Sequence, residues 1–155
     1  LLARQGARVF CLDLHPAAAA ETAGIIRAEG GDAEAFTADV TDGAQVEAAV
    51  AACVARFGAL DLAPRAAEDA HRLLAALGPE PLEAVWDAQL AMNLRSVFLC
   101  CKHALPHLRA AAPSAIVNLA SIVALRMAEG RTHLAYSAAK QGVIALSRHV
   151  AMEHA

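Results

Sequence analysis

Hydrophobic and polar residues follow two different periods along the first sixty positions of the chain. Short runs that are apolar or strictly alternating are typical of β-strands, whereas apolar residues spaced three and four apart are typical of helices. The pattern predicts strands at residues 7–14 and 33–38 and helices at residues 17–29 and 45–57. Gly6 and Gly58 follow helical segments, and we expect both to cap them. This alternation of strands and helices predicts the α/β fold class.

Longer helical patterns surround one apolar strand in the second half of the chain. We expect helices at residues 81–108 and 133–155. Between them, residues 115–120 have the length and β-branched content of a buried strand, and Ser121 stands where this strand ends. Gly142 lies within the last helix and permits the close approach of a neighbouring element.

The stretch after residue 62 departs from this alternation. Residues 60–62 begin as a strand, but residues 63–77 are polar and rich in alanine, which predicts a helix with Pro64 in its first turn. We therefore expect residues 63–80 to form an atypical segment in the place of a central strand.

Length and charge exclude several classes of protein. The 155 residues are enough for one domain with a buried core. The formal net charge of −3 gives no reason to expect nucleic-acid binding. No window contains the ~20 consecutive apolar residues of a membrane-spanning helix, and no leader pattern opens the chain, so we expect no membrane contact.

The cysteines indicate a reducing compartment. They are Cys11, Cys53, Cys100 and Cys101. None forms a Cys-x-x-Cys pair, so we expect a cytoplasmic protein without disulfides. Cys100, His103 and His107 share one helical face and are of the types that bind zinc. No fourth ligand is apparent, so we predict no metal site.

Two residues of the last predicted helix have the chemistry of an acid–base catalyst. Tyr136 and Lys140 are four residues apart, so their side chains share a face of the helix. A neighbouring ammonium group stabilises a phenolate and so lowers the pKa of the phenol. A general acid or base works best when its pKa lies near the working pH. The same spacing occurs where an exposed aromatic residue lies beside a solvated lysine, so the pair alone leaves both interpretations open.

Three motifs give this pair a context. Residues 92–98 contain Asn93, residues 116–121 end at Ser121, and residues 136–140 contain the tyrosine and the lysine. In order and spacing, these motifs resemble the short-chain dehydrogenase/reductase family. The resemblance implies a partial doubly wound, Rossmann-type parallel sheet with flanking helices. It also implies an NAD(P)-dependent oxidoreductase that interconverts an alcohol and a carbonyl group of a small molecule.

The resemblance also implies a role for each of four residues. Tyr136 would transfer the proton, and Lys140 would stabilise its phenolate. Both residues would also contact the cofactor at the ribose of the nicotinamide. Ser121 would hydrogen-bond the substrate oxygen. Asn93 would hold a water molecule in a proton relay to the lysine. A solvent-facing position is the alternative for Asn93, because asparagine is unfavourable inside a helix.

Two acidic positions after predicted strands are candidate cofactor contacts. Asp13 ends a strand where an acidic residue bonds the ribose 2′-hydroxyl and repels a 2′-phosphate, so NAD is expected rather than NADP. Asp39 and Val40 match the pair that contacts adenine in the family. The alternatives are a turn aspartate at Asp13 and a helix N-cap at Thr41 or Asp42.

Parts of the family pattern are missing from this sequence. No glycine-rich turn precedes residue 7, and no Asn-Asn-Ala-Gly segment follows residue 62. We therefore interpret residues 1–155 as a single partial dinucleotide-binding domain, lacking the N-terminal glycine-rich turn and the C-terminal segment. In the family, the two long helices pair with those of a second subunit, so a homo-oligomer is expected. The alternatives are a catalytically inactive fragment and a helical association module.

Overall fold

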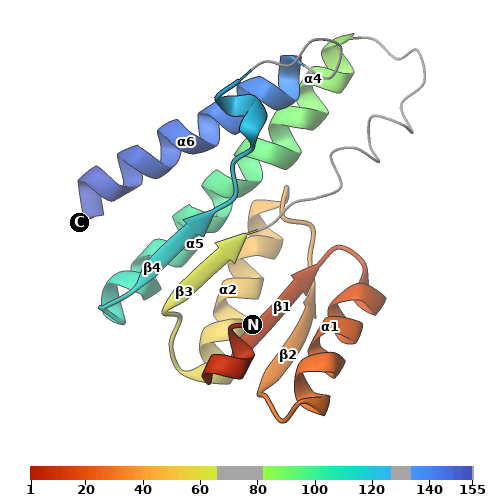
Figure 1. The fold of residues 1–155 in the computed structure, drawn as a ribbon, viewed down its shortest axis with the longest axis vertical. Helices are drawn as coiled ribbons and strands as arrows, with labels where there is room; N and C mark the ends of the chain where they lie inside the picture. The colour runs from red at the N-terminus through yellow and green to blue at the C-terminus, as the bar shows by residue number, and fades with distance from the viewer. Residues whose placement is uncertain (66–81, 127–133, 155) are drawn as a thin grey trace. The chain divides into compact units, whose positions relative to one another are not determined.

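The computed structural model describes residues 1–65, 82–126 and 134–154 of the chain (Figure 1). These residues divide into two compact units. The first unit comprises Leu1–Asp61 with His103–Ser114, and the second unit comprises Leu62–Lys102 with Ala115–Ala155. Within the described residues, no helix is long and apolar enough to cross a membrane.

The elements follow one another largely as the sequence pattern predicts. The chain begins with η1 (Ala3–Gln5), β1 (Val9–Asp13), α1 (Pro16–Ala28), β2 (Ala33–Thr37) and α2 (Gly43–Phe57). It continues with β3 (Leu62–Arg65), α4 (Leu82–Leu90), η2 (Ala91–Arg95), α5 (Ser96–Ala110), β4 (Ala115–Asn118), η3 (Ile122–Ala124) and α6 (Leu134–His154). The helix α5 contributes residues to both units, because the first unit takes up the chain again at His103.

The first unit contains a parallel pair of strands, β1 and β2. Side chains alternate between the two faces of a strand. On one face, Cys11 of β1 and Ala33 of β2 pack against Ala23 of α1 and form a small apolar core. The helix α1 therefore covers this face of the strand pair.

Aromatic rings gather on the opposite face of the same strands. The ring centroid of Phe10 lies 5.5 Å from that of Phe36 and 6.3 Å from that of Phe57, at the end of α2. Edge-to-face and tilted rings at such distances attract one another beyond the effect of burial. With α1 on one face and α2 contributing to the other, the first unit has the layers of a doubly wound fold, as predicted.

Both ends of α2 are capped by residues that the sequence predicted as caps. Asp42 is the N-cap, and its carboxylate accepts hydrogen bonds from the backbone nitrogens of Ala44 and Gln45. Of the two predicted N-cap candidates, the structure therefore selects Asp42. Gly58 ends the helix with a φ of 82°, a left-handed conformation that glycine adopts without strain.

A second parallel pair corrects the prediction for the start of residues 63–77. We expected a helix there, with Pro64 in its first turn, but β3 runs through Leu62–Arg65 and pairs with β4. Among the described residues β4 is the one strand beside β3, and proline is tolerated in such an edge strand. Pairing with a distant strand here overrides a local helical pattern. Residues 66–81 lie outside the described part of the chain.

The strand β4 is less buried than its composition predicted. Ile116 packs against a core cluster that contains Val97 and Val143, but Val117 points the other way and is 49% exposed. The prediction of a buried strand was therefore wrong for one face. In the described residues the strands form two separate two-stranded parallel sheets, β1 with β2 and β3 with β4.

The predicted helix at residues 81–108 is interrupted by one widened turn. The helix α4 ends at Leu90, a π-helical turn spans Ala91–Arg95, and α5 continues from Ser96. Single π-turns inside α-helices are rare and often coincide with functional sites. Asn93 lies at the centre of this turn.

Candidate functional site

The helix α6 brings Tyr136 and Lys140 together near its start. α6 begins at Leu134, so the two side chains lie one turn apart on the same face. The ammonium nitrogen of Lys140 lies 5.7 Å from the centroid of the Tyr136 ring. Lys140 is only 4% exposed, so the alternative of a solvated lysine is wrong. A buried lysine beside a phenol is an arrangement suited to proton transfer.

A hydrogen bond joins this lysine to the chain that follows β4. The Nζ atom of Lys140 donates to the backbone oxygen of Leu119 at 3.0 Å. Ser121, two residues later, is the N-cap of η3, and its Oγ atom accepts a bond from the nitrogen of Val123 at 3.4 Å. Because Ser121 accepts in this bond, its own hydroxyl hydrogen can be donated elsewhere. Ser121 therefore follows by two residues Leu119, the residue to which Lys140 is hydrogen-bonded.

Asn93 is completely buried, so the solvent-facing alternative is wrong. Its Nδ2 atom donates to the backbone oxygen of Gln89 at 3.2 Å and to the side-chain Oε1 of Gln89 at 2.9 Å. Its Oδ1 atom is buried and has no hydrogen-bond partner among the described residues. An unsatisfied buried acceptor costs about 1–3 kcal/mol, so such an atom calls for a functional explanation.

The helix α6 packs closely against the widened turn that holds Asn93. A Cβ atom added to Gly142 would lie 2.8 Å from Cδ2 of Leu94, which is closer than side chains tolerate. The predicted close approach at Gly142 is confirmed, and Leu94 is the neighbour. The absence of a side chain at Gly142 thus brings the helix with Tyr136 and Lys140 against the turn with Asn93.

Sequence reasoning missed several polar residues of the second unit. Asn118 donates to the hydroxyl of Ser147 at 3.0 Å, and Ser147 donates to the backbone oxygen of Val143 at 2.7 Å, so this bridge ties β4 to α6. Gln89 was missed as well, although it precedes Asn93 by four residues, the spacing at which helical side chains meet. The polar side chains that are buried in the described residues are Gln89, Asn93, Ser96, Ser137 and Lys140.

The candidate cofactor residues lie in the first unit, where two parallel strands end side by side. Asp13 is the last residue of β1, and its Oδ1 accepts a bond from the nitrogen of His15 at 2.8 Å. Asp39 follows β2, and its Oδ1 accepts bonds from the nitrogen and the hydroxyl of Thr41 at 2.8 and 2.7 Å. The half-buried Val40 separates Asp39 from Thr41. The bond at Asp13 stabilises a turn, as the alternative for that residue expected, and the bonds at Asp39 order the segment that leads to the N-cap Asp42. Both carboxylates follow the carboxyl ends of the paired strands.

The predicted site residues thus fall into two groups. Asp13, Asp39 and Val40 belong to the first unit, and Asn93, Ser121, Tyr136 and Lys140 belong to the second. Among them, the structure shows a contact between Tyr136 and Lys140.

The cysteines are thiols, and those of the first unit are core residues. Burial raises the pKa of the Cys11 and Cys53 thiols, so both stay protonated and make poor nucleophiles. No three metal-binding side chains gather in the portion of the chain that the structure describes, which includes Cys100, His103 and His107.

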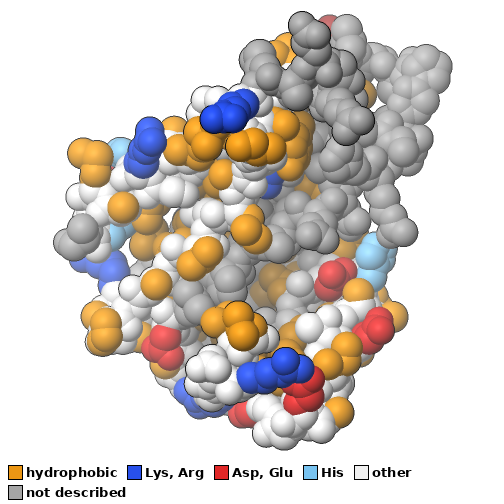
Figure 2. Space-filling view, in the orientation of Figure 1, with side chains coloured by type: hydrophobic (Ala, Val, Ile, Leu, Met, Phe, Trp, Pro, Cys, Tyr) orange, Lys and Arg blue, Asp and Glu red, His pale blue; other side chains and the backbone are white. Residues whose placement is uncertain are grey.

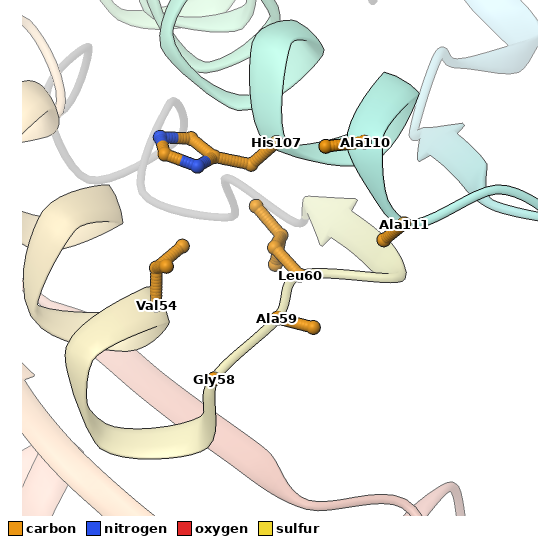
Figure 3. Close-up of a pocket in the computed structure, with 7 residues that line it drawn as sticks. All are labelled: Val54, Gly58, Ala59, Leu60, His107, Ala110 and Ala111. Carbon is orange, nitrogen blue, oxygen red and sulfur yellow. The ribbon is translucent and has the colours of Figure 1, made fainter.

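A small cavity in the first unit is lined by none of the predicted catalytic or cofactor residues. It has a volume of about 140 Å³, and Figure 3 shows the side chains of Val54, Leu60 and His107 around it. The remaining lining residues are Gly58, Ala59, Ala110 and Ala111. With one polar side chain in an otherwise apolar lining, it offers little that could recognise a charged cofactor.

Comparison with known proteins gives one family across the whole chain. The family model described as enoyl-(acyl carrier protein) reductase matches residues 1–155. The D-threitol dehydrogenase of Mycolicibacterium smegmatis is 36% identical over 153 residues, which are 97% of this chain and 56% of that protein. The 2-(R)-hydroxypropyl-CoM dehydrogenase of Xanthobacter autotrophicus is also 36% identical over 153 residues, 97% of this chain and 60% of that protein.

Solved structures agree with these relatives. A Burkholderia xenovorans protein described as a short-chain dehydrogenase/reductase is 38% identical, with a TM-score of 0.81 over 98% of this chain and 58% of that one. A 3-ketoacyl-ACP reductase from Sinorhizobium meliloti is 32% identical, with a TM-score of 0.82 over 98% of this chain and 59% of that one. The chain spans less than two thirds of the length of the relatives named here.

Proposed function

The chain belongs to the short-chain dehydrogenase/reductase family, and from this premise we propose that it serves a nicotinamide-dependent interconversion of an alcohol and a carbonyl group. The single observation that carries the proposal is the buried Lys140 beside Tyr136 on α6, with its ammonium group bonded to Leu119 at 3.0 Å. Burial of an ammonium group destabilises the folded state. A role in proton transfer with the phenol one helical turn away would explain why the lysine is buried there.

In this proposal, the residues of the second unit handle the proton. The hydroxyl of Tyr136 gives its proton to the substrate oxygen during reduction and takes it back during oxidation. Lys140 stabilises the phenolate through its positive charge. The hydroxyl of Ser121 donates a hydrogen bond to the substrate oxygen, where negative charge develops. Asn93 holds a water molecule of the proton relay.

The family implies a nicotinamide cofactor, which supplies or accepts the hydride when bound. The chemistry of this chain fits that group, because carboxylates at the ends of β1 and β2 suit the hydroxyls of a ribose. We propose Asp13 as the contact of the adenosine ribose and Asp39 with Val40 as contacts of the adenine. Tyr136 and Lys140 would hold the ribose of the nicotinamide.

We further propose NAD rather than NADP as the preferred cofactor. The carboxylate of Asp13 repels a 2′-phosphate and accepts a hydrogen bond from a 2′-hydroxyl. One of its oxygens is bonded to the nitrogen of His15, which holds the carboxylate at the end of β1.

The exposed apolar side chains of the helices support a proposal about assembly. Phe98 on α5, Trp86 on α4 and Met152 on α6 are all exposed. Figure 2 shows hydrophobic side chains along the visible surface of α6 and η3. Contiguous exposed apolar patches are typical of protein interfaces, and we propose that the long helices join a second copy of the chain.

Replacement of Tyr136 by phenylalanine tests the proposed function. The test uses the protein as its gene encodes it, with D-threitol and NAD+ in one direction and acetoacetyl-coenzyme A and NADH in the other. Tyr136→Phe keeps the ring but removes the exchangeable proton, so turnover should fall by the ~10²–10⁴ typical of a lost general acid. The affinity for NADH should stay nearly unchanged, because the ring and its packing remain.

Ser114→Ala provides the control, because it removes a hydroxyl that bonds to the Leu108 oxygen in the first unit. Its turnover should match that of the unmodified protein. Wild-type turnover in Tyr136→Phe, or no turnover of either probe by the unmodified protein, would count against the proposed function.

A further inference from the structure

Asn118, the last residue of β4, lies on the face of this strand that packs against α5 and α6. Ile116, two positions earlier and so on the same face, packs against the apolar cluster that contains Cys101 of α5 and Val143 of α6. Asparagine is disfavoured in strands, and a β-branched apolar residue would suit such a position better. The half-buried amide of Asn118 therefore calls for an explanation other than strand formation.

The amide of Asn118 is held in one orientation by Ser147. The hydroxyl of Ser147 donates its one hydrogen to the backbone oxygen of Val143 at 2.7 Å, so toward Asn118 it can only accept. The Nδ2 atom of Asn118 supplies the donor at 3.0 Å, and it also lies 3.9 Å from the Sγ atom of Cys101, a weak acceptor. A flipped amide would place its oxygen against the oxygen of Ser147 and lose both contacts.

The next residue of the chain is attached to the same helix by a second bond. The backbone oxygen of Leu119 accepts a hydrogen bond from Nζ of Lys140 at 3.0 Å. Lys140 and Ser147 are about two helical turns apart on α6, so they lie on one face of that helix. Two consecutive residues at the end of β4 are thus bonded to one face of α6, the first through its side chain and the second through its backbone.

The position of the Leu119 carbonyl determines where the ammonium group of Lys140 rests. A lysine side chain is a flexible stem that can place its ammonium group in many positions, and a fixed acceptor selects one of them. With the bond to Leu119 in place, Nζ lies 5.7 Å from the centroid of the Tyr136 ring. Because the attraction between opposite charges weakens with distance, a displaced carbonyl would reduce the stabilisation that Lys140 gives to a phenolate at Tyr136.

We propose that Asn118 is a positioning residue for proton transfer. Its bond to Ser147 fixes the backbone at Leu119. The carbonyl of that residue in turn holds the ammonium group of Lys140 beside Tyr136. This inference rests on the proposed function, in which Lys140 stabilises the phenolate of Tyr136. Asn118 itself contacts neither substrate nor cofactor in this scheme.

Two single variants and their combination test the bridge in the protein as its gene encodes it, with the same two pairs of substrate and cofactor. Asn118→Leu keeps the size of the side chain and removes its donors, and Ser147→Ala removes the acceptor. Each should lower kcat by about fivefold or more through the displaced ammonium group, while the KM of the substrate changes less than twofold. The double variant should lose no more than either single variant, because both remove one bond. Ser147→Thr keeps the hydroxyl and should retain the kcat of the unmodified protein.

The same substitution in a Lys140→Met background shows whether the effect passes through the lysine. There, Asn118→Leu should change kcat by less than twofold, because the group that it positions is already gone. A purely structural role of Asn118 would instead lower kcat by the same factor in both backgrounds.

A readout independent of turnover follows the ammonium group itself. In the proton–nitrogen NMR spectrum, the ammonium signal of Lys140 is identified by its disappearance in Lys140→Met. Its protons should exchange slowly with solvent in the unmodified protein, because the residue is buried and bonded to Leu119. Exchange should become about tenfold faster in Asn118→Leu and in Ser147→Ala, and it should stay slow in Ser147→Thr.

Ile116→Val is the matched control, because Ile116 lies on the same face of β4 and packs against the same cluster. The variant weakens this packing and removes no hydrogen bond. Its kcat and the exchange of the Lys140 ammonium group should stay as in the unmodified protein. If Asn118→Leu does not fold, Ser147→Ala decides, because alanine is the residue most favourable to a helix.

Four outcomes would overturn the inference. They are unchanged kcat or unchanged ammonium exchange in the folded bridge variants, losses that add in the double variant, an equal loss with and without Lys140, and an equal loss in Ile116→Val. The parallel Tyr136→Phe variant separates this failure from failure of the proposed function. Loss of turnover in Tyr136→Phe together with normal kcat in Asn118→Leu refutes the role of Asn118 alone.

Discussion

The two units of the chain treat their polar side chains in opposite ways. In the first unit the ion pairs lie at the surface, as in Arg4 with Glu29 and Arg56 with Asp32, while the core is built from apolar side chains. No polar side chain of the first unit, all of whose residues are described, is fully buried. The second unit buries five of them, two of which are Asn93 and Lys140.

In the second unit, the same buried polar side chains contribute both to folding and to the proposed chemistry. Exposed ion pairs contribute little to stability because water and salt screen them. Buried polar groups, in contrast, are costly unless every one has a partner. We therefore expect surface substitutions in the first unit to alter cofactor binding or, slightly, stability, and substitutions of the buried polar residues in the second unit to alter catalysis most strongly.

The largest expected effect is that of Lys140→Met in the second unit. Methionine keeps an apolar stem in the buried slot but removes the ammonium group and its bond to Leu119. In the protein as its gene encodes it, kcat should fall by at least ~10², the range for loss of an acid–base function. Steady-state kinetics and thermal unfolding together measure the effect.

Lys102→Met is the matched control, because Lys102 is exposed on α5 in the same unit. Its kcat should stay within twofold of the unmodified protein. Equal activity of the two methionine variants would remove the distinction between the buried and the exposed lysine, and with it the contrast between the units.

Local patterns predicted the first unit well and the second unit only in part. Strands and helices near residues 7–57 follow from periods of two and 3.6 and from caps such as Asp42 and Gly58. The start of a strand was predicted at residues 60–62, but its continuation to Arg65 was missed because its partner, β4, begins 53 residues later at the paired positions Leu62 and Ala115. Propensity reports short-range preferences and cannot register such a distant pairing.

The candidate site was predictable as motifs but not as an environment. The spacing of Tyr136 and Lys140 predicts that they meet, and the structure agrees. The burial of Lys140 and the bond to Leu119 depend on packing between distant segments, which no local pattern encodes. The partnership of Gln89 with Asn93 was visible as a spacing of four residues, but the helical pattern gave it no chemical meaning.

A smaller effect is expected for Asp13→Asn in the first unit. The variant removes the charge that disfavours a 2′-phosphate, so the ratio of the NADPH and NADH dissociation constants should fall by about tenfold, or about 1.4 kcal/mol. Fluorescence titration with both cofactors measures it, and turnover at saturating NADH should change little. Asp61→Asn, an exposed carboxylate of the same unit, is the control and should leave the ratio unchanged. Tighter binding of NADPH than of NADH by the unmodified protein would contradict the assignment.

The smallest effect is expected for Glu29→Gln at the surface of the first unit. The guanidinium group of Arg4 bonds to both carboxylate oxygens of Glu29, at 2.8 and 2.6 Å, and lowers the pKa of Glu29. A lowered pKa in the folded state means that the pair stabilises the fold above the unfolded value of about 4.3, and that this effect disappears as the pH falls through the folded value.

Urea unfolding between pH 3 and 8 compares Glu29→Gln with the unmodified protein. The difference in unfolding free energy should be constant above about pH 5, decrease as the pH falls below the unfolded pKa of about 4.3, and shrink in 1 M salt. Glu47→Gln, exposed on α2, is the control without this ion pair. A difference that grows toward low pH would contradict the assigned sign.

The π-turn at Ala91–Arg95 shifts by one residue the helix positions that face the core. Val97 and Cys101 are buried one turn apart, and the same stripe continued backward at α-helical spacing reaches Leu90. The residue that is fully buried there is Gln89, one position earlier. One extra residue in a turn rotates everything beyond it by roughly 100°. The widened turn therefore determines that the amide of Gln89, and not the side chain of Leu90, occupies the buried position. This part of the helix thus places a polar group in the interior as well as packing against the core.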